Sequence, residues 1–345
     1  MSYKIALIYD LTTKNMKDSI ESYYADQQKK ITKDTICKVL QKKYEIIEIA
    51  ANEKIFEQLT AYQFDLVFNL STGIRGESRQ SQIPAILEML GIPYVGSGIL
   101  SHALALNKSM AKQVFIHNNI PTAAFQIFHT GEENLSSHLK FPLIVKPACE
   151  GSGFGVHKDS IVHTKDALKK KISHLLQTYQ PPVLVEEFIE GREFTVGVIG
   201  NGKNKTILPI MEISFQNVPH KYGKFYTFEL KTELGDFVEF YCPASIDTNL
   251  EQKIKTSVSK AFDVLECRDF ARVDVRVTAN QPYIIEINSL PGLKPGYSDL
   301  PKMALKAGIS YENLIFMLTE AAIIRINGSP KHKKIRRDSD ERKVV

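Results

Sequence analysis

Residues 271–276 read Ala-Arg-Val-Asp-Val-Arg, and residues 284–288 read Ile-Ile-Glu-Ile-Asn. Both stretches have the alternating pattern that is typical of β-strands. The segment between them, 278–282, reads Thr-Ala-Asn-Gln-Pro and is typical of a turn, so the two strands are predicted to pair as a hairpin. The hairpin and the Ser-Leu-Pro-Gly that follows it at 289–292 form the most informative part of the chain.

The polar side chains of this hairpin are expected to share one face of the sheet. Residues two apart on a strand lie on the same side, so Arg272, Asp274 and Arg276 form one row, and Glu286 and Asn288 form another. Pairing brings Asp274, Glu286 and Asn288 together as a set of oxygen ligands. Hard Mg²⁺ prefers such ligands, and nucleotide phosphates can complete its coordination. The sequence therefore predicts a site for Mg²⁺ and ATP.

The composition is that of an ordinary globular protein. The chain has 345 residues, of which 43% are hydrophobic and 24% charged, so two or three domains are expected. No apolar run approaches the roughly 18 residues of a membrane-spanning helix, and the first ten residues lack a signal-peptide core. The four cysteines form no CxxC pair, which predicts free thiols. The nine histidines show no zinc-like spacing. We expect a cytoplasmic protein without membrane contact.

The charge is concentrated at the C-terminal end. The net charge is +5, and the last fifteen residues carry seven basic and three acidic side chains. The rest of the chain is therefore nearly neutral, which argues against nucleic acid as the main partner. The basic segment 327–345 is expected to be disordered, and a docking role is the alternative.

Strands and helices alternate along the first hundred residues. Strands are predicted at Lys4–Asp10, Tyr44–Ala50, Phe64–Leu70 and Pro93–Val95, and helices at Asp26–Lys42 and Ser81–Leu90. This order predicts an α/β N-terminal domain, residues 1–105, with an open parallel sheet and helices on both faces.

The remainder is richer in strands and is predicted to form two α+β units, residues 106–190 and 191–326. Its strands are predicted at 141–148, 183–189, 194–199, 207–213 and 237–241, and its helices at 108–119, 164–177, 250–267, 301–307 and 311–324. Residues 216–235 are polar and aromatic without a regular period. We expect them to form a mobile loop that covers a site.

A glycine-rich stretch follows the predicted strand that carries Lys146. Residues 149–155 read Cys-Glu-Gly-Ser-Gly-Phe-Gly, and their backbone N–H groups can approach a phosphate closely. Lys146 can direct a cation at the same phosphates. A simple hairpin turn is the alternative, and the stretch is not a Walker A loop because no Gly-Lys-Ser/Thr follows.

Acidic residues cluster where the strand 183–189 ends. They are either exposed charges at a strand end or part of a nucleotide cleft. In the second case Glu186 accepts a hydrogen bond from the adenine amino group and Glu193 accepts from the ribose hydroxyls. Phe188 and Ile189 then lie against the ring.

The loop after the third predicted strand carries Arg75, Glu77 and Arg79. Ligands of open α/β sheets bind beyond the carboxyl ends of the strands, and arginine suits a substrate carboxylate. These residues are predicted to bind a zwitterionic or carboxylate substrate. Capping of the next helix by Ser78 or Ser81 is compatible with that role. No Ser/His/Asp or Cys/His pattern indicates covalent catalysis.

Taken in order, these motifs resemble the D-alanine–D-alanine ligase family of the ATP-grasp superfamily. The resemblance runs from about Asp65 to Leu314. It is carried by Leu90-Gly-Ile-Pro-Tyr-Val-Gly-Ser-Gly98, Asn107-Lys108, Ile144-Val-Lys-Pro147, Glu150-Gly-Ser152, Glu186-Glu-Phe-Ile189, Gly191-Arg-Glu-Phe-Thr-Val196, Arg272-Val-Asp274, Glu286-Ile-Asn-Ser-Leu-Pro-Gly292 and Ala307-Gly-Ile-Ser310. It implies an α/β N-terminal open parallel sheet followed by α+β ATP-grasp domains.

The resemblance also implies roles for individual residues. Lys108 and Lys146 would hold the α- and β-phosphates of ATP, and Lys231 would meet the γ-phosphate. Arg272 and the Gly292 backbone N–H would stabilise a tetrahedral oxyanion. The other implied site residues are Glu150 and Ser152 over the phosphates, Glu186, Glu187, Phe188, Ile189 and Glu193 around adenosine, Asp274, Glu286 and Asn288 on two Mg²⁺ ions (with Mn²⁺ as a possible substitute), and Tyr297 and Ser298 near the substrate. Ser152 is also counted among the catalytic residues.

The chain departs from the family pattern at two places. The first strand in the family is followed by a glycine-rich loop and a glutamate, whereas residues 10–16 here read Asp-Leu-Thr-Thr-Lys-Asn-Met. The family also has His-Gly where this chain has Thr72-Gly73. In the family the missing groups contact the first amino acid. The resemblance therefore implies the ATP chemistry and leaves the substrate open.

The function expected from the sequence is an ATP-dependent carboxylate–amine ligase. Such an enzyme forms an amide bond between amino acids or related small molecules through an acyl phosphate. The alternatives are a true D-alanine–D-alanine ligase, an ATP-binding protein without ligase turnover, and an ATP-grasp enzyme that uses another acceptor. Carboxylate and amine substrates are the expected partners, and the family resemblance implies a homodimer.

Overall fold

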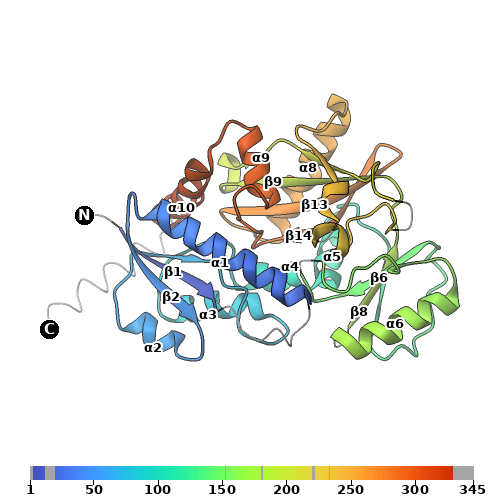
Figure 1. The fold of residues 1–345 in the computed structure, drawn as a ribbon, viewed down its shortest axis with the longest axis horizontal. Helices are drawn as coiled ribbons and strands as arrows, with labels where there is room; N and C mark the ends of the chain where they lie inside the picture. Colours follow the sequence, from blue (N-terminus) through green and yellow to red (C-terminus); the bar gives the residue numbers. More distant parts are fainter. Residues whose placement is uncertain are drawn as a thin grey trace.

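The computed structural model shows three sheets in succession along the chain (Figure 1). It describes residues 3–11, 20–151, 153–179, 182–219, 222–232 and 234–328. For residues 20–27 and 232 the description covers the backbone alone. Three sequence predictions fall wholly or largely outside this part: the role of Ser152, the loop after Asp10, and the basic segment of which 329–345 are not described.

The first sheet is parallel throughout, as the alternation of strands and helices predicted. Its strands, in spatial order, are β2 (Glu45–Ala51), β1 (Lys4–Asp10), β3 (Leu66–Asn69) and β4 (Tyr94–Val95). Buried apolar side chains occupy both faces of β1, because a parallel sheet is covered on both sides. Ligands of such a sheet meet the carboxyl ends of the strands, where Asp10 and the loop after β3 lie.

Helices from distant parts of the chain cover this sheet. On one face, Ile5 and Leu7 belong to a hydrophobic core that also contains Ile36 of helix α1 (Ile20–Leu40) and Phe316 of helix α10. The opposite face packs against two shorter helices. The helices are α10 (Tyr311–Gly328), α2 (Ile55–Thr60) and α3 (Gln82–Met89). The last helix of the chain therefore stabilises the first sheet.

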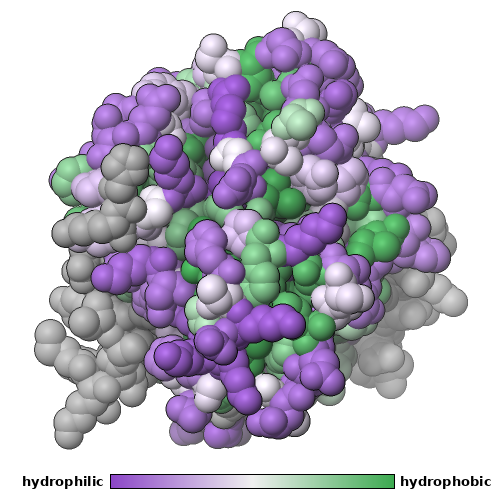
Figure 2. Space-filling view, turned by 90° about the vertical axis from the view of Figure 1, so that its right-hand side faces the viewer, coloured by the Kyte–Doolittle hydropathy of each residue, from purple (hydrophilic) through white to green (hydrophobic). Residues whose placement is uncertain are grey.

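The second sheet is a smaller antiparallel unit with a core of its own. Its strands, in spatial order, are β5 (Phe125–Phe128), β8 (Val183–Glu187), β6 (Leu143–Pro147) and β7 (Ile161–Val162). Helix α6 (Lys165–Tyr179) packs on it through buried residues such as Leu168 and Leu175. Figure 2 views this end of the molecule, where hydrophobic side chains show in a central band between hydrophilic surfaces.

The third sheet contains the predicted hairpin. Its main strands, in spatial order, are β12 (Glu239–Tyr241), β11 (Met211–Ser214), β9 (Arg192–Ile199), β13 (Phe270–Thr278) and β14 (Gln281–Asn288), and β10 (Thr206–Ile207) pairs with β9. Strands β13 and β14 pair antiparallel through a two-residue turn, Ala279-Asn280, whose φ values are +46° and +61°. Positive φ at both positions fits the twist of a tight hairpin turn, and asparagine tolerates it well.

Three helices share one hydrophobic core with the third sheet. They are α4 (Ile99–Leu106), α5 (Lys108–His117) and α8 (Thr248–Val264). Phe115 of α5 and Phe262 of α8 share one core with the strands of this sheet. The predicted domain boundaries after residues 105, 190 and 326 stay a prediction.

Several short elements differ from the sequence prediction. Helices α2, α4 and α7 (Phe228–Thr232) and strands β5 and β7 lie in segments where no element was predicted. The segment 216–235 was expected to be a loop, yet it contains α7 and buries Phe225, Phe228 and Leu230. Its aromatic residues pack against neighbouring segments, so their spacing follows tertiary contacts and has no helical period. The expected mobility of this segment stays a prediction.

In the described part of the chain, no single helix combines the length and apolar character required to cross a membrane. The pair formed by α9 (Asp299–Lys306) and α10 meets that requirement jointly, with a bend of 105° between the two helices.

Candidate active site

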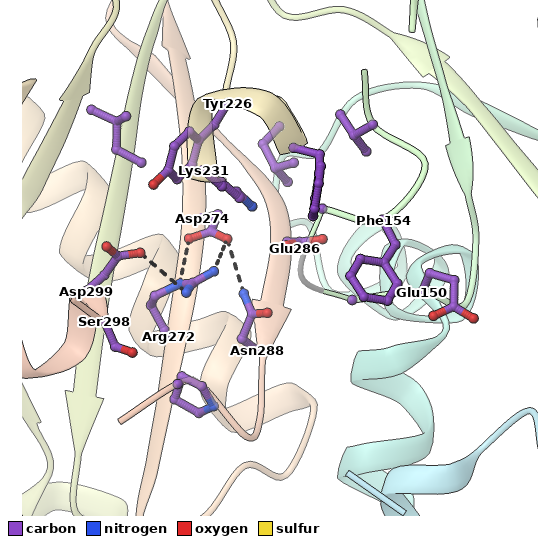
Figure 3. Close-up of a pocket in the computed structure, with 18 of the residues that line it drawn as sticks. Glu150, Phe154, Tyr226, Lys231, Arg272, Asp274, Glu286, Asn288, Ser298 and Asp299 are labelled. Carbon is purple, nitrogen blue, oxygen red and sulfur yellow. Dashed lines mark hydrogen bonds and ion pairs between the residues drawn. The ribbon is translucent and has the colours of Figure 1, made fainter. Parts of the chain in front are cut away.

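The hairpin directs its polar side chains into a cavity of about 730 Å³ between the three sheets. Asp274 lies opposite Glu286, and Arg272 lies opposite Asn288, as the alternation of side chains predicted. A register shift follows between Asp274 and Val275. Figure 3 shows the four side chains converging on one space.

The carboxylate of Asp274 is held by three side chains. Arg272 donates from Nε to Oδ1 at 3.0 Å and from Nη2 to Oδ2 at 2.8 Å. The hydroxyl of Thr195 donates to Oδ1 at 2.7 Å, and Asn288 Nδ2 donates to Oδ2 at 3.1 Å. Because the amide nitrogen of Asn288 faces Asp274, its carbonyl oxygen is the end left for a ligand.

A second carboxylate fixes Arg272. Asp299, at the start of α9, lies 3.4 Å from Nη1 of the guanidinium. Burial acts to lower the pKa of Arg272, but Asp274 and Asp299 outweigh it and raise the pKa, so the guanidinium stays charged. The sequence did not single out Asp299, because an acidic residue in the first turn of a helix is common on electrostatic grounds alone.

Glu286 is surrounded by cations from separate segments. Lys108 Nζ lies 3.5 Å from its Oε2. Burial acts to raise the pKa of Glu286, but Lys108, Lys146, Lys231 and Arg272 lower it to about 2. The carboxylate is therefore ionised at any ordinary pH.

Helix α5 positions Lys108. The side chain of Asn107 caps this helix by accepting a hydrogen bond from Met110 N, which leaves Lys108 at the first helical position. Lys108 Nζ also donates to the backbone carbonyl of Glu150 in the glycine-rich loop. We call the seven charged and amide residues gathered here the catalytic face. They are Lys108, Lys146, Lys231, Arg272, Asp274, Glu286 and Asn288.

A buried ion triad supports this face. Glu186 lies between Lys146 Nζ at 2.5 Å and Lys112 Nζ at 2.7 Å, and all three side chains are buried. Burial acts to raise the pKa of Glu186, but the two lysines outweigh it and lower the pKa. Lys112 was not predicted, because one lysine in a helical pattern looks like a surface residue until Glu186 is placed opposite it.

An arginine also holds the segment that is predicted to bind adenosine, residues 186–193. Arg276 donates to Glu193 at 2.7 Å and to the Ile189 carbonyl at 2.7 Å, and its guanidinium lies 4.6 Å from the ring centroid of Phe188. Burial raises the pKa of Glu193 although Arg276 opposes it. Glu187 accepts a hydrogen bond from the backbone N–H of Lys140 at 2.8 Å.

The glycine-rich loop and the segment around α7 contact each other above the catalytic face. Phe228 N donates to the Val156 carbonyl at 2.8 Å, and the rings of Phe154 and Phe228 lie 6.2 Å apart, edge to face. A side chain at Gly153, whose φ is +82°, would come within 3.2 Å of Lys231 Nζ. Glycine at this position therefore lets Lys231 approach the loop backbone.

The structure places sixteen of the predicted site residues on the cavity wall. They are Lys108, Lys146, Glu150, Glu186, Glu187, Phe188, Ile189, Glu193, Lys231, Arg272, Asp274, Glu286, Asn288, Gly292, Tyr297 and Ser298. Gly292 packs closely on Ser298, whose Oγ accepts a hydrogen bond from Lys294 N at 3.0 Å. Tyr297 donates to the Lys231 carbonyl at 3.2 Å.

Three predicted substrate residues lie off this wall. Arg75 and Glu77 are exposed, and Arg79 reaches the site only through an ion pair with Glu150 at 2.9 Å. Gly73 has a φ of +89°, and a Cβ there would lie 1.9 Å from the Arg79 carbonyl oxygen. The loop therefore folds back on itself and turns Arg75 and Glu77 toward solvent.

Strand β1, helix α1 and the loop after β3 supply further polar groups to the cavity, and we call Asp10, Lys29 and Thr72 the N-terminal face. Lys29 Nζ lies 2.8 Å from Asp10 Oδ2 and 3.3 Å from Thr72 Oγ1. Burial acts to raise the pKa of Asp10, but Lys29, Ser71 and Thr72 outweigh it and lower the pKa. Asp10 and Thr72 stand at the two departures from the family pattern, whereas Lys29 gave no local signal in the sequence.

Comparison with known proteins identifies the family. The family model described as "D-ala D-ala ligase C-terminus" matches residues 114–320. The D-alanine–D-alanine ligase of Ralstonia pickettii is 34% identical over 275 residues, 78% of each chain. That of Carboxydothermus hydrogenoformans is 36% identical over 295 residues, 82% of this chain and 90% of the relative.

A solved structure agrees with the sequence relatives. The D-alanine–D-alanine ligase of Bacillus anthracis complexed with ATP has a TM-score of 0.74 and 26% identity, and the match covers 94% of this chain and 97% of that one. Proteins of this family use ATP and Mg²⁺ to join small molecules such as amino acids. The present chain belongs to the D-alanine–D-alanine ligase family of ATP-grasp enzymes, and it is an ADP-forming ligase that joins a carboxylate to an amine.

Proposed function

We propose that the catalytic face binds the phosphates of ATP together with Mg²⁺. Lys108, Lys146, Lys231 and Arg272 converge on Glu286, beside the oxygen ligands Asp274 and Asn288, and such a set suits a polyphosphate with its metal ion. This convergence is the observation that carries the proposal. Lys108 and Lys146 would hold the α- and β-phosphates, and Lys231 the γ-phosphate. Glu150 and Ser152 would close over them.

The donor set fits a hard divalent ion. The carboxylate of Asp274 accepts hydrogen bonds from three side chains, nearby cations lower the pKa of Glu286, and Asn288 presents its carbonyl oxygen. These three residues would hold two Mg²⁺ ions, with Mn²⁺ as a substitute. The metal supplies charge neutralisation for the transferred phosphoryl group. No set of three His, Cys, Asp or Glu side chains suited to a metal occurs in the described residues, so the amide oxygen of Asn288 is essential to this assignment.

The adenosine part of ATP would lie at the end of β8, a strand of the second sheet. Phe188 and Ile189 would contact the base, and Glu193 would accept from the ribose. Glu186 would accept from the adenine amino group, while Lys146 and Lys112 fix its position. Glu187 would support the same pocket through its backbone.

The chemistry requires only a few actions from the chain. An oxygen of the substrate carboxylate attacks the γ-phosphorus, ADP leaves, and an acyl phosphate forms. The amine then attacks the acyl carbon, the developing oxyanion accepts hydrogen bonds from Arg272 and the Gly292 N–H, phosphate leaves, and the amine loses a proton. The segment around α7 would exclude water from the acyl phosphate.

The acid substrate would lie between the catalytic face and the N-terminal face. Tyr297 and Ser298 would contact the amine substrate on the opposite side. Arg75, Glu77 and Arg79 would act on the substrate from the loop outside the cavity wall. A true D-alanine–D-alanine ligase is the second candidate, because relatives of this chain carry that name.

We also propose a cytoplasmic homodimer that does not bind nucleic acid or membranes. Its domains would comprise residues 1–105, 106–190 and 191–326, with a basic tail. Sedimentation velocity on the full chain tests the dimer.

A panel of acids and amines tests the function. Purified protein, ATP and Mg²⁺ are incubated with pairs of amino acids and related acids, and ADP, phosphate and product mass are measured. We expect ADP and phosphate in equal amounts together with a product joined through an amide. Turnover with D-alanine alone would select the second candidate, and ATP binding without ADP formation from any pair would contradict ligase turnover.

A further inference from the structure

The N-terminal face carries a cation, Lys29, beside the two positions at which the chain departs from the family pattern, and this bears on the substrate. The inference rests on the proposed function, which places the acid substrate against this face. Among the described lining residues of β1, α1 and the loop after β3, the charged ones are Asp10 and Lys29. Their described neighbours on the wall, such as Tyr9, Gln28 and Thr32, are uncharged.

Asp10 has no free capacity for a substrate ammonium group. Its Oδ1 accepts from Ser71 Oγ at 2.5 Å, and its Oδ2 accepts from Thr72 Oγ1 at 2.7 Å. Thr72 N lies 3.2 Å and 3.1 Å from the two oxygens, and Lys29 Nζ lies 2.8 Å from Oδ2. A carboxylate offers about four acceptor sites, and these four donors fill them. Asp10 therefore acts as an anchor for Lys29.

Among the described residues, Lys29 has partners for two of its three N–H donors, and it has better access to the cavity than Asp10. An ammonium group has three N–H donors, and Asp10 and Thr72 take two of them. The side chain of Lys29 is 34% exposed, whereas that of Asp10 is 11% exposed. A ligand entering the cavity therefore meets the cation, and the carboxylate lies behind it.

We propose that the acid substrate carries a second carboxylate, and that Lys29 binds it while the reacting carboxylate lies at the catalytic face. The substrate class is a dicarboxylic acid, with or without an amino group. A neutral acceptor such as a hydroxyl or amide makes a weaker hydrogen bond to an ammonium group than a carboxylate does. At equal chain length, a dicarboxylic acid should therefore bind more tightly than a monocarboxylic acid.

Matched acids test the proposal by calorimetry, independently of turnover. The pairs are succinate with butyrate, glutarate with valerate, and glutamate with norvaline, each titrated into protein with Mg²⁺ and a non-hydrolysable ATP analogue. We expect at least one dicarboxylate to bind about tenfold more tightly than its partner. Lys29→Met should reduce this ratio below about twofold, and Lys29→Arg should retain most of it.

The neighbouring residue provides the control. Lys30 is exposed on the same helix and does not line the cavity, so Lys30→Met should bind like the wild type. Circular dichroism checks that each variant is folded. Equal binding within every pair, or a preference that survives in Lys29→Met, would overturn the proposal.

An ADP assay separates this proposal from the proposed function. ADP formation from monocarboxylic acids, unaffected by Lys29→Met, would leave the ligase intact and overturn the role of Lys29. Binding of dicarboxylates that depends on Lys29, without ADP formation from any acid and amine, would support the role of Lys29 and contradict the ligase.

Discussion

The catalytic face and the N-terminal face line the same cavity, but their charges are held in different ways. On the catalytic face, cations from α5, β6, α7 and β13 all lower the pKa of one carboxylate, Glu286. On the N-terminal face, the described residues form one ion pair, Asp10 with Lys29, and the adjacent Ser71 and Thr72 hold its carboxylate. A site held by many distant segments tolerates little change, whereas a local pair can be replaced without disturbing the fold. We therefore propose that the first face determines the reaction type and the second face the choice of substrate.

The largest effect is expected when a charge is removed from the catalytic face. Glu286→Gln should reduce ADP formation by a factor on the order of 100 or more, because it removes a charged ligand for Mg²⁺ and the counter-charge of several lysines. The measurement is ADP release at saturating ATP over a range of Mg²⁺ concentrations. Glu190→Gln, at an exposed position outside the cavity wall, serves as the control. Turnover near the wild-type rate in Glu286→Gln would remove this residue from the metal site.

The buried triad provides a test of stability. Glu186→Gln leaves Lys112 and Lys146 facing each other without a counter-charge, so the unfolding free energy should fall by about 3–5 kcal/mol. Lys112→Met leaves the pair of Glu186 and Lys146 and should cost less than half as much. Urea unfolding measures both, and Glu187→Gln is the neighbouring control. An equal cost for Glu186→Gln and Lys112→Met would show that the triad is not held by Glu186.

A buried histidine beside the catalytic face should make stability depend on pH. His102 Nδ1 lies 2.7 Å from Ser289 Oγ, directly after Asn288, and burial lowers its pKa to about 4, with Arg268 adding to the effect. Because the folded pKa lies below the ordinary 6.5, stability is complete above pH 6.5 and is lost as the pH falls toward 4. The lost stability is about 3 kcal/mol.

His102→Gln should lack this component of the pH dependence, since glutamine can still bond to Ser289 and does not titrate. The measurement is the unfolding free energy of both proteins between pH 7 and pH 4. Parallel curves would mean that His102 takes up its proton as readily in the folded chain as in the unfolded one.

The smallest effects are expected in the loop outside the N-terminal face. Arg79→Ala frees Glu150 and should raise the KM of a substrate about threefold to fivefold, in keeping with a partly exposed ion pair. Arg75→Ala should change it less than twofold, because Arg75 is exposed and lies off the wall. Steady-state kinetics with each substrate varied in turn measures both. A larger effect from Arg75→Ala would mean that this loop closes onto the substrate.

The sequence was most predictive where a local period decides the outcome. The period of two predicted that Asp274, Glu286 and Asn288 meet on one face of a hairpin, and the alternation of strands and helices predicted the parallel first sheet. The family resemblance predicted the ligase chemistry. By contrast, Lys112 and Lys29 resemble other helical lysines, and only tertiary contacts with Glu186 and Asp10 distinguish them. Arg75 failed to reach the wall because the backbone turns back at Gly73, which the sequence pattern did not reveal.

The separate core of the second sheet has a mechanical consequence. That sheet and α6 share no core residues with the rest, whereas α5 belongs to the core of the third sheet. The ion pair of Lys112 and Glu186 is therefore one of the contacts that join these two parts, beside hydrogen bonds such as that from Phe228 N to the Val156 carbonyl. We expect the second sheet and α6 to rotate as a rigid body about this ion pair when nucleotide binds and leaves. Small-angle scattering with and without an ATP analogue would detect this rotation. Identical profiles would indicate that the closed arrangement is already present without nucleotide.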